Sequence, residues 1–470
     1  MLFPTLEFAI FFAVVFCVSW SLRRRDGLRK LFLLAASYYF YSWWDWRFSF
    51  LLLFASLVAY AGGLAIAAAR TEARRRGVVG VTVALLLVVL GFFKYFDFFL
   101  SSLATVLADL GLARDIPLLQ IVLPVGISFF TFHAISYIVD VYRGDAAPRR
   151  SLVDLLLYMA FFPPLVAGPI VRAAQFLPQL ERRRRLTRRA LAFGLTLCVI
   201  GLFKKMVLAN YLATDLVDPV FFDPTAFGTP VLLFAAYGYA MQIYCDFSGY
   251  SDLAIGTAAL LGYHLRPNFR QPYRSASLQE FWRRWHISLS SWLRDYLYKP
   301  LGGSRLGEFA TYRNLMITML LGGLWHGAAW TFVVWGLLHG AGLAVERAWR
   351  ERFGPRALSW PGRVLAVIVT FHFVCAAWIF FRAEDFGLAA DYFRGLAALT
   401  PDVSLITPFA VLMVAIPLVF QFTPEHLGSR IAASLRLAPA LVLGLLAGVS
   451  IVLIELVAPP GTAPFIYFQF

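Results

Sequence analysis

The chain has 470 residues, of which 60% are hydrophobic and only 15% charged, and its formal net charge is +15. This composition excludes an ordinary soluble domain, in which apolar residues make up about half of the chain. The basic residues lie in short loops between apolar segments, so we expect a lipid membrane rather than a nucleic acid as partner. No long polar stretch interrupts this pattern, and residues 1–470 are predicted to form one integral-membrane domain.

Eleven apolar runs predict an all-α bundle of about eleven membrane-spanning helices. In chain order they cover residues 2–22, 31–46, 48–69, 78–100, 118–142, 190–210, 229–262, 330–346, 364–382, 403–422 and 438–457. Arginine-rich loops follow the first, third and fifth runs, whereas the loops near Asp45 and Asp109 are not basic, which places the N-terminus outside the cytoplasm. The first run contains Glu7 and no early Lys or Arg, so it is predicted to be an uncleaved span rather than a signal peptide.

Two further segments are predicted to be re-entrant, entering and leaving the membrane on one side. Residues 151–171 are broken by prolines, including Pro163 and Pro169, and are basic at both ends. Residues 311–329 contain the glycines Gly322, Gly323 and Gly327. Irregular backbone at membrane depth must be covered by protein or line a cavity. Transporters use broken helices as well, so these segments alone do not define a function.

Residues 278–299 predict a helix of a different kind. Large apolar side chains recur at helical spacing, at Trp282, Trp285, Leu289, Trp292 and Tyr296. Arginines and a lysine lie between them. We therefore expect one amphipathic helix at the cytoplasmic interface of the membrane.

His286 and His326 are the main candidates for chemistry, because each follows a tryptophan in an apolar protein. An ionisable side chain at membrane depth is costly, and its presence is a hypothesis of function. Glycines around His326 let a substrate approach, and a neutral imidazole there can take a proton from a hydroxyl. The alternatives are a hydrogen-bonded core histidine for His326 and a brace on the interfacial helix for His286. The residues alone leave both alternatives open.

A polar island interrupts the apolar run 229–262. Its polar members include Asp246, Ser248, Tyr250 and Asp252. Carboxylates at this depth must be paired or face a cavity. The island therefore predicts either the lining of a substrate tunnel or an internal salt bridge, for instance to Arg172 or Arg274. The four cysteines lack metal-ligand spacing, and we expect no bound metal or redox cofactor.

Several motifs resemble those of the membrane-bound O-acyltransferase (MBOAT) family, in its bacterial branch of alginate O-acetyltransferase-like proteins. The resemblance rests on residues 126–132, 167–170, 246–252, 280–290, 296–303, 323–328 and 464–470. It implies a helical bundle with a trans-membrane tunnel, whose motif core covers roughly residues 120–345. It also implies acetyl transfer from cytoplasmic acetyl-CoA across the bacterial inner membrane for O-acetylation of an extracytoplasmic polysaccharide.

The resemblance assigns roles to individual residues. The family's catalytic histidine falls on His326, and its second active-site position, variously His, Asn or Asp, falls on His286. Basic residues cluster where the phosphates of coenzyme A would bind. The expected substrate-binding residues are Arg274, Arg283, Arg284, Arg294, Lys299, Trp285, Trp325, Asp246, Ser248, Tyr250 and Asp252. Whether the two histidines meet at one atom or act in sequence stays open.

The acceptor and the partner are also open. Transfer can be direct, or it can pass through a periplasmic SGNH-type acetyltransferase or a polysaccharide secretion complex. Peptidoglycan O-acetylation and D-alanyl transfer to teichoic acid are alternatives. A transporter of an acyl group or a lipid-linked sugar and a pure scaffold are the other classes of protein. Release of free thiol from acetyl-CoA distinguishes an acyltransferase from a transporter, and a scaffold predicts no effect of changing either histidine.

Overall fold

The computed structural model describes residues 1, 3–112, 117–182, 184–354, 358–425, 427–461 and 466, and every regular element among them is a helix. The all-α prediction is therefore confirmed. The chain divides into two compact units, residues 1–186 with 260–265 and residues 187–259 with 266–470. Of the C-terminal motif at 464–470, only Ile466 lies within the described residues.

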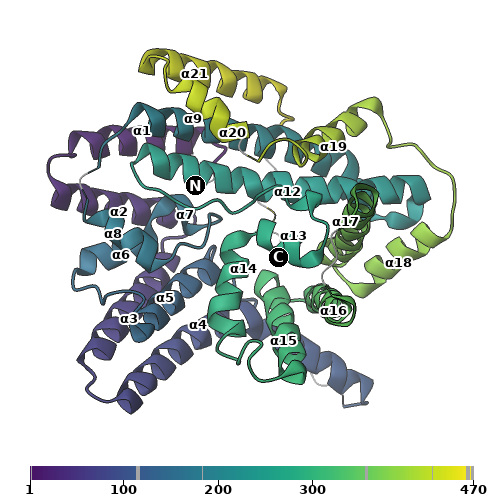
Figure 1. Ribbon diagram of the computed structural model, residues 1–470, viewed down its shortest axis with the longest axis horizontal. Helices are drawn as coiled ribbons and strands as arrows, with labels where there is room; N and C mark the ends of the chain where they lie inside the picture. The colour runs from purple at the N-terminus through teal and green to yellow at the C-terminus, as the bar shows by residue number, and fades with distance from the viewer. Residues whose placement is uncertain are drawn as a thin grey trace. The chain divides into compact units, whose positions relative to one another are not determined.

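The first unit is built from the helices α1 to α8 (Figure 1). Their bounds are α1 Leu6–Ser21, α2 Asp26–Ser42, α3 Phe48–Ala68, α4 Glu72–Asp109, α5 Ile127–Arg143, α6 Leu152–Ala160, α7 Phe162–Leu165 and α8 Ala173–Leu180. Helices α3, α4 and α5 pack against one another. Close packing depends on Gly62 and Gly63 of α3, because a Cβ atom there would lie 2.8 Å from Ile138 Cδ1 and 2.7 Å from the Tyr137 hydroxyl oxygen.

The predicted break in residues 151–171 is confirmed. Helix α6 ends at Ala160, α7 lasts one turn, and the backbone then runs without helix to Arg172. Side chains satisfy both backbone polar groups of Val171 in this stretch: its N–H donates to His133 Nε2 over 2.9 Å, and the Tyr158 hydroxyl donates to Val171 O over 2.9 Å. Such pairing is what non-helical backbone inside a membrane protein requires.

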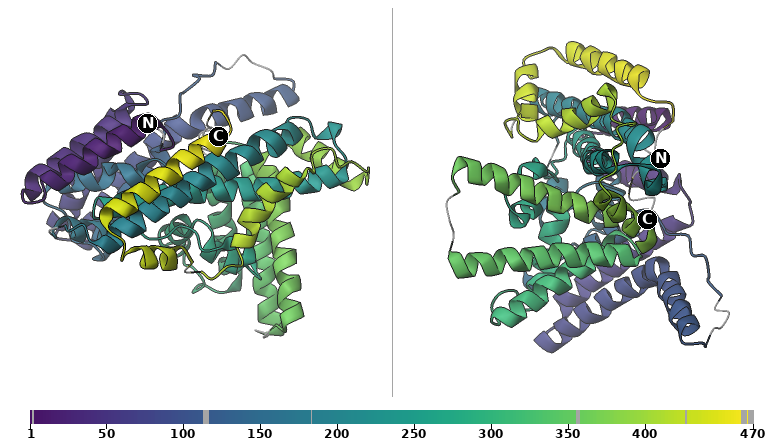
Figure 2. Two further views of the ribbon diagram at one scale, coloured as in Figure 1. Left: turned by 90° about the horizontal axis from the view of Figure 1, so that it is seen from above. Right: turned by 90° about the vertical axis from the view of Figure 1, so that its right-hand side faces the viewer.

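The second unit contains the elements from α9 to α21 (Figure 2). Its elements before residue 300 are α9 Arg188–Leu202, η1 Phe203–Ala209, α10 Asn210–Leu212, η2 Ala213–Val217, α11 Asp218–Phe222, η3 Pro224–Ala226, α12 Thr229–Leu260, η4 Pro272–Arg274, α13 Leu278–Arg284, α14 Ile287–Leu293 and η5 Arg294–Tyr298. The later elements are α15 Glu308–His326, α16 Trp330–Phe353, α17 Trp360–Arg382, α18 Phe386–Ala397, α19 Pro408–Phe420, α20 Leu427–Leu435 and α21 Ala440–Val457.

Each predicted span coincides with a helix, but the count of eleven is not confirmed. Among the described residues, five helical segments are long and apolar enough to cross a membrane: Phe48–Ala68, Glu72–Asp109, Arg188–Phe222, Trp360–Arg382 and Ala440–Val457. The predicted span 118–142 starts as a helix only at Ile127, after Pro124 and after Gly126, whose φ is +77°. A proline and a left-handed glycine are typical of a helix boundary rather than of a helix interior.

In the segment 311–329, predicted to be re-entrant, the helix is broken at Gly327 and not at the adjacent pair Gly322 and Gly323. Helix α15 runs through Gly322 and Gly323 without interruption to His326, and it packs along α16 as a hairpin. A Cβ atom at Gly323 would lie 2.2 Å from Phe332 O, and one at Gly336 would lie 2.4 Å from Met319 O. These glycines therefore allow two helices to touch and do not break one. The turn of the hairpin follows at Gly327.

The single amphipathic helix predicted for residues 278–299 is also wrong. The segment consists of α13, α14 and the π-helical η5, with a sharp break at Trp285 and His286. Trp285 is extended, and His286 has the left-handed backbone angles φ +40° and ψ +54°. The helical spacing of the aromatic residues correctly predicted helix on either side of the break. The break itself depends on contacts made by residues 268–270.

Candidate active site

His286 occupies the break between α13 and α14 and is completely buried. Two backbone hydrogen bonds attach this break to the preceding loop: Arg270 N–H donates to Arg284 O, and Ile287 N–H donates to Asn268 O, both over 2.9 Å. The loop and the break thus pair like a short piece of sheet. This pairing turns the His286 side chain away from the helix surface and into the core.

Asn268 determines the tautomer of His286. Its side-chain oxygen accepts the backbone N–H of Ser288 over 3.1 Å and the Ser288 hydroxyl over 2.8 Å. The same oxygen lies 3.2 Å from His286 Nδ1, which must therefore be the protonated nitrogen. The other ring nitrogen, Nε2, then carries a lone pair, and it has no hydrogen-bond partner among the described residues.

His326 is the last residue of α15 and is only 4% exposed. Its ring centroid lies 5.1 Å from that of Trp335 and 5.2 Å from that of Phe381, which are both edge contacts. The centroids of His286 and His326 are 6.4 Å apart, and Trp325 packs against both rings. The two histidines are forty residues apart in the chain, but their imidazole rings lie next to each other in the core. They are close enough to act on one small group between them.

The polar island of α12 is an internal ion-pair site, but its partners are not the predicted ones. Asp246 pairs with Lys205 at 2.5 Å, and Asp252 pairs with Lys204 at 2.7 Å. Neither pair involves Arg172 or Arg274, the partners named from the sequence. Adjacent lysines reach two carboxylates because they lie in the π-helical segment η1, and π-helical turns are frequent at functional sites.

The island touches the histidine pair through an apolar residue. The Phe247 ring lies 4.6 Å from the His286 ring in an edge contact. Ser248 and Tyr250 are both 2% exposed, and Lys205 lies 5.6 Å from the centre of the Tyr250 ring. Asp246 also accepts the backbone N–H of Ile466 over 2.8 Å. The island therefore packs against the site through Phe247, and its two carboxylates pair with the lysines of η1.

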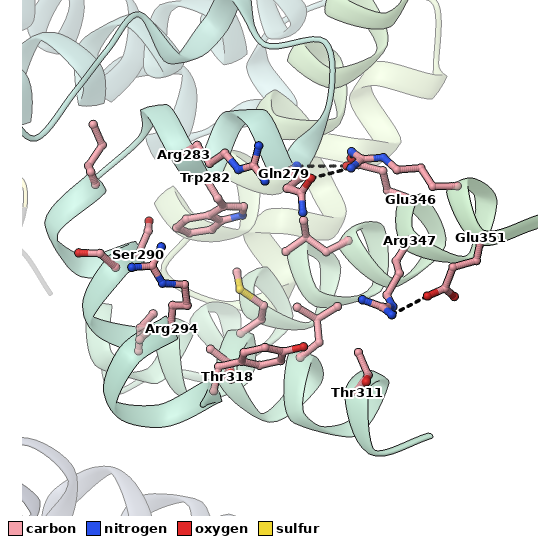
Figure 3. A pocket seen from close by; sticks show the side chains of 18 residues that line it. Gln279, Trp282, Arg283, Ser290, Arg294, Thr311, Thr318, Glu346, Arg347 and Glu351 are labelled. Atoms are coloured by element: carbon pink, nitrogen blue, oxygen red, sulfur yellow. Dashed lines mark hydrogen bonds and ion pairs between the residues drawn. The ribbon is translucent and has the colours of Figure 1, made fainter. Parts of the chain in front are cut away.

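A pocket of ≈ 650 Å³ opens beside the histidine pair, between α13, α14 and η5 on one side and α15 and α16 on the other (Figure 3). Its basic lining residues are Arg283, Arg294, Arg347 and Arg350, and its acidic ones are Glu346 and Glu351. Arg347 pairs with Glu351, and Arg350 pairs with Glu346 and donates to Gln279. Arg283 is exposed and has no ion-pair partner among the described residues.

The predicted donor-binding residues divide into two groups. Arg283 and Arg294 line the pocket. Arg284 instead pairs with Glu280 and Glu425, and its hydrogen bond holds the pKa of Glu425 below its ordinary value. Lys299 pairs with Asp295 at 2.8 Å, Arg274 donates to Gln271 Oε1 over 3.0 Å, and neither is part of the pocket lining.

Two tryptophan side chains in contact link the pocket to His326. Trp282 lines the pocket and lies 5.7 Å from Trp335, which contacts His326. Trp285 is completely buried and packs against Trp378 at 5.1 Å, so it belongs to the buried core. His339, interpreted from the sequence as structural, packs against Trp335 at 4.8 Å.

Sequence reasoning missed Asn268, Lys205 and the two arginines of α16 that line the pocket. Lys205 carried a signal, because a lysine pair inside an apolar run requires buried partners. Arg347 and Arg350 follow His326 by about six helical turns of hairpin, and only the packing of α15 on α16 brings them to the same pocket. Asn268 lies in a loop, where spacing carries no information about contacts.

The fold and the site define a class of protein: a multi-pass helical membrane protein with two buried imidazoles beside a charged pocket. The sequence profile of the MBOAT, membrane-bound O-acyltransferase family, matches residues 38–383. The chain belongs to this family, and it is an O-acyltransferase.

Curated relatives agree with this assignment. The protein named probable alginate O-acetylase AlgI of Azotobacter vinelandii is 47% identical over 368 residues, which cover 77% of this chain and 71% of that protein. The peptidoglycan O-acetyltransferase of Helicobacter pylori is 36% identical over 79% of this chain and 74% of its own length. The teichoic acid D-alanyltransferase of Bacillus subtilis is 28% identical over 56% of this chain and 69% of its own length.

Proposed function

We propose that this enzyme takes an acetyl group from acetyl-CoA on the cytoplasmic side and delivers it across the bacterial inner membrane to an extracytoplasmic polysaccharide. The observation that carries the proposal is the pair of buried imidazoles, 6.4 Å apart, beside a pocket that contains an arginine without an ion-pair partner among the described residues. Coenzyme A is polyanionic, and guanidinium groups bind phosphates through paired hydrogen bonds. The proposal has the N-terminus outside the cytoplasm, as the basic loops predict.

The chemistry that we assign to the site is a single acyl transfer. The acceptor hydroxyl attacks the thioester carbonyl carbon, the carbon–sulfur bond breaks, and the hydroxyl proton passes through His326 to the leaving thiolate. A thioester is already activated, so the protein mainly positions both reactants and moves one proton. The lone pair on His286 Nε2 favours an orienting role, because this atom can accept a hydrogen bond from an amide of the pantetheine arm.

The test of the catalytic role is acetyl transfer by the His326→Ala protein. General acid–base catalysis contributes about 10² to 10⁴ in rate, and we expect turnover to fall by at least 10². His372→Ala is the matched control, because His372 lies in α17 of the same unit and bonds to the Tyr237 hydroxyl outside the site. Near-normal turnover by a folded His326→Ala protein would contradict the proposal. Uptake without thiol release from acetyl-CoA would identify a transporter instead.

The donor site is tested by Arg283→Gln. An exposed ion pair contributes up to about 1 kcal/mol, so the KM for acetyl-CoA should rise about fivefold while kcat changes little. Arg352→Gln is the control, because Arg352 belongs to α16 but does not line the pocket. Equal effects of both substitutions would mean that the pocket does not hold the donor phosphates.

The polymer acceptor is the finer part of the proposal. The names of the AlgI relatives support alginate-like exopolysaccharide, reached directly or through an SGNH-type periplasmic partner. The Helicobacter pylori relative makes peptidoglycan the second candidate. Mass analysis of the secreted polymer and of the cell wall, with and without this enzyme, separates the two. Loss of acetyl groups from neither polymer would exclude both acceptors.

A further inference from the structure

The first unit carries an apolar groove of ≈ 540 Å³ between α3 and α4, outside the candidate active site. Its floor is formed by small, exposed residues, Ala61 and Ala65 of α3 and Gly77 of α4. Larger apolar side chains, such as Val81 and Leu85, line the rest. The groove exists because side chains at three neighbouring positions are too small to fill the surface between the two helices.

Gly77 has no reason within the protein to be a glycine. A Cβ atom placed there meets no other atom within 4 Å. This differs from Gly62 on the inner face of α3, where a Cβ atom would clash with Ile138 and Thr82. A glycine inside a helix costs up to about 1 kcal/mol relative to alanine. Gly80 and Gly91 of α4 are equally open, so an open glycine alone marks no site; Gly77 differs from both because it lines the groove beside Ala61 and Ala65.

One end of the groove carries a cation without a partner. Three arginines follow one another at the start of α4. Arg75 pairs with Glu72 at 3.6 Å and donates to Tyr142 O, and Arg76 pairs with Glu72 at 3.0 Å. Arg74 lines the groove, is exposed, and makes no side-chain hydrogen bond or ion pair with the described part of the chain.

The length of the groove matches one leaflet of a bilayer. Arg74 and Leu85 are eleven residues apart on α4, and a helix rises about 1.5 Å per residue, so the groove runs for about 16 Å. Half of the hydrocarbon core is about 15 Å. Both α3 and α4 are long and apolar enough to span a membrane. A cation at one end of an apolar groove about one leaflet long matches the headgroup and acyl chain of a phospholipid.

We propose that this groove is a binding site for an anionic glycerophospholipid, with its phosphate on Arg74 and one acyl chain in the groove over Gly77. Basic residues next to a spanning helix attract anionic headgroups from the cytoplasmic leaflet. The second acyl chain stays in the bilayer. A transmembrane helix of a partner protein is the rival occupant, since small residues also mark helix–helix contacts, but such a helix leaves Arg74 without a counter-ion.

The experiment is native mass spectrometry of the full-length protein in mild detergent with added phosphatidylglycerol or phosphatidylethanolamine. A surface arginine contributes about fivefold to anionic lipid binding. Arg74→Gln should therefore lower bound phosphatidylglycerol about fivefold, whereas Arg76→Gln, at the paired neighbour, should not. A Cβ atom at Gly77 meets no atom within 4 Å, so Gly77→Leu places a side chain in the groove and should lower retention of both lipids. Its control is Gly80→Leu, because Gly80 is equally open but does not line the groove.

Three outcomes would overturn the proposal. Equal loss on Arg74→Gln and Arg76→Gln would mean diffuse attraction to a basic loop rather than a site. Unchanged lipid retention in the Gly77→Leu protein would mean that the groove holds no chain. A membrane protein that co-purifies with the wild type and is lost with Gly77→Leu, while lipid binding stays the same, would assign the groove to a partner helix.

Discussion

Replacement of Asn268 by alanine tests the assignment of the His286 tautomer. The Asn268 side-chain oxygen accepts three hydrogen bonds, two from Ser288 and one from His286. Leaving a buried donor unpaired costs about 1–3 kcal/mol. If the hydrogen bond that His286 loses stabilises the transition state, this cost adds to the activation free energy. Turnover then falls roughly 5- to 150-fold, since each 1.36 kcal/mol is a factor of ten. The losses on Ser288 appear mainly as lower stability.

The assay measures kcat and KM for thiol release from acetyl-CoA in folded protein. Asn268→Asp keeps the accepting oxygen and the size of the side chain, so it should restore most of the lost kcat. Asn314→Ala is the control for stability, because Asn314 is equally buried and its side chain bonds to Leu301 O, Gly303 O and the Arg313 guanidinium, none of which contacts His286 in a hydrogen bond. The reasoning fails if Asn268→Ala and Asn314→Ala lower kcat equally, or if Asn268→Asp rescues nothing.

Three further predictions concern stability. Asp246→Asn should cost about 3–5 kcal/mol by removing the carboxylate that pairs with the buried Lys205 charge, while the double change Lys205→Met with Asp246→Leu should recover most of it in thermal unfolding. Gly323→Val should prevent the α15–α16 hairpin from forming, seen as loss of monodisperse protein, because even a Cβ atom meets Phe332 O at 2.2 Å. Glu425→Gln should cost at most about 1 kcal/mol at neutral pH. Because the pKa of Glu425 is lowered, its contribution is complete above the ordinary carboxyl pKa of about 4.3 and is lost as pH falls through the lower folded value, so wild type and variant should converge in acid.

Apolar periodicity predicted the helices well, because membrane helices form from local hydrogen bonds and apolar composition. It failed where the backbone structure of a segment depends on contacts with another segment of the chain. The glycines at 322 and 323 were interpreted as a helix break, because the sequence does not show that Phe332 lies against them. The same limit explains the interfacial segment, where pairing with residues 268–270 splits one apparent helix into α13 and α14.

For the candidate site, too, the residues could be predicted from the sequence, but their tertiary contacts could not. His286 and His326 were identified from their residue types and from the resemblance, whereas their 6.4 Å separation is a product of tertiary packing. The carboxylates of α12 were correctly expected to be paired or to face a cavity. Their partners could not be predicted, because a π-helical turn in η1 changes which face each lysine occupies.

The left-handed backbone at His286 has a consequence for how this position can evolve. With φ at +40°, the residue lies in a region that costs a residue other than glycine about 1–3 kcal/mol. Asparagine, aspartate and histidine tolerate this region best. These are the same three residue types that the resemblance assigns to this position of the family. The left-handed backbone therefore restricts the residue types at this position independently of the reaction that the side chain takes part in. Selection for a new acyl group should accept Asn or Asp here far more readily than Gln, Glu or Lys, whatever proton transfer the reaction requires.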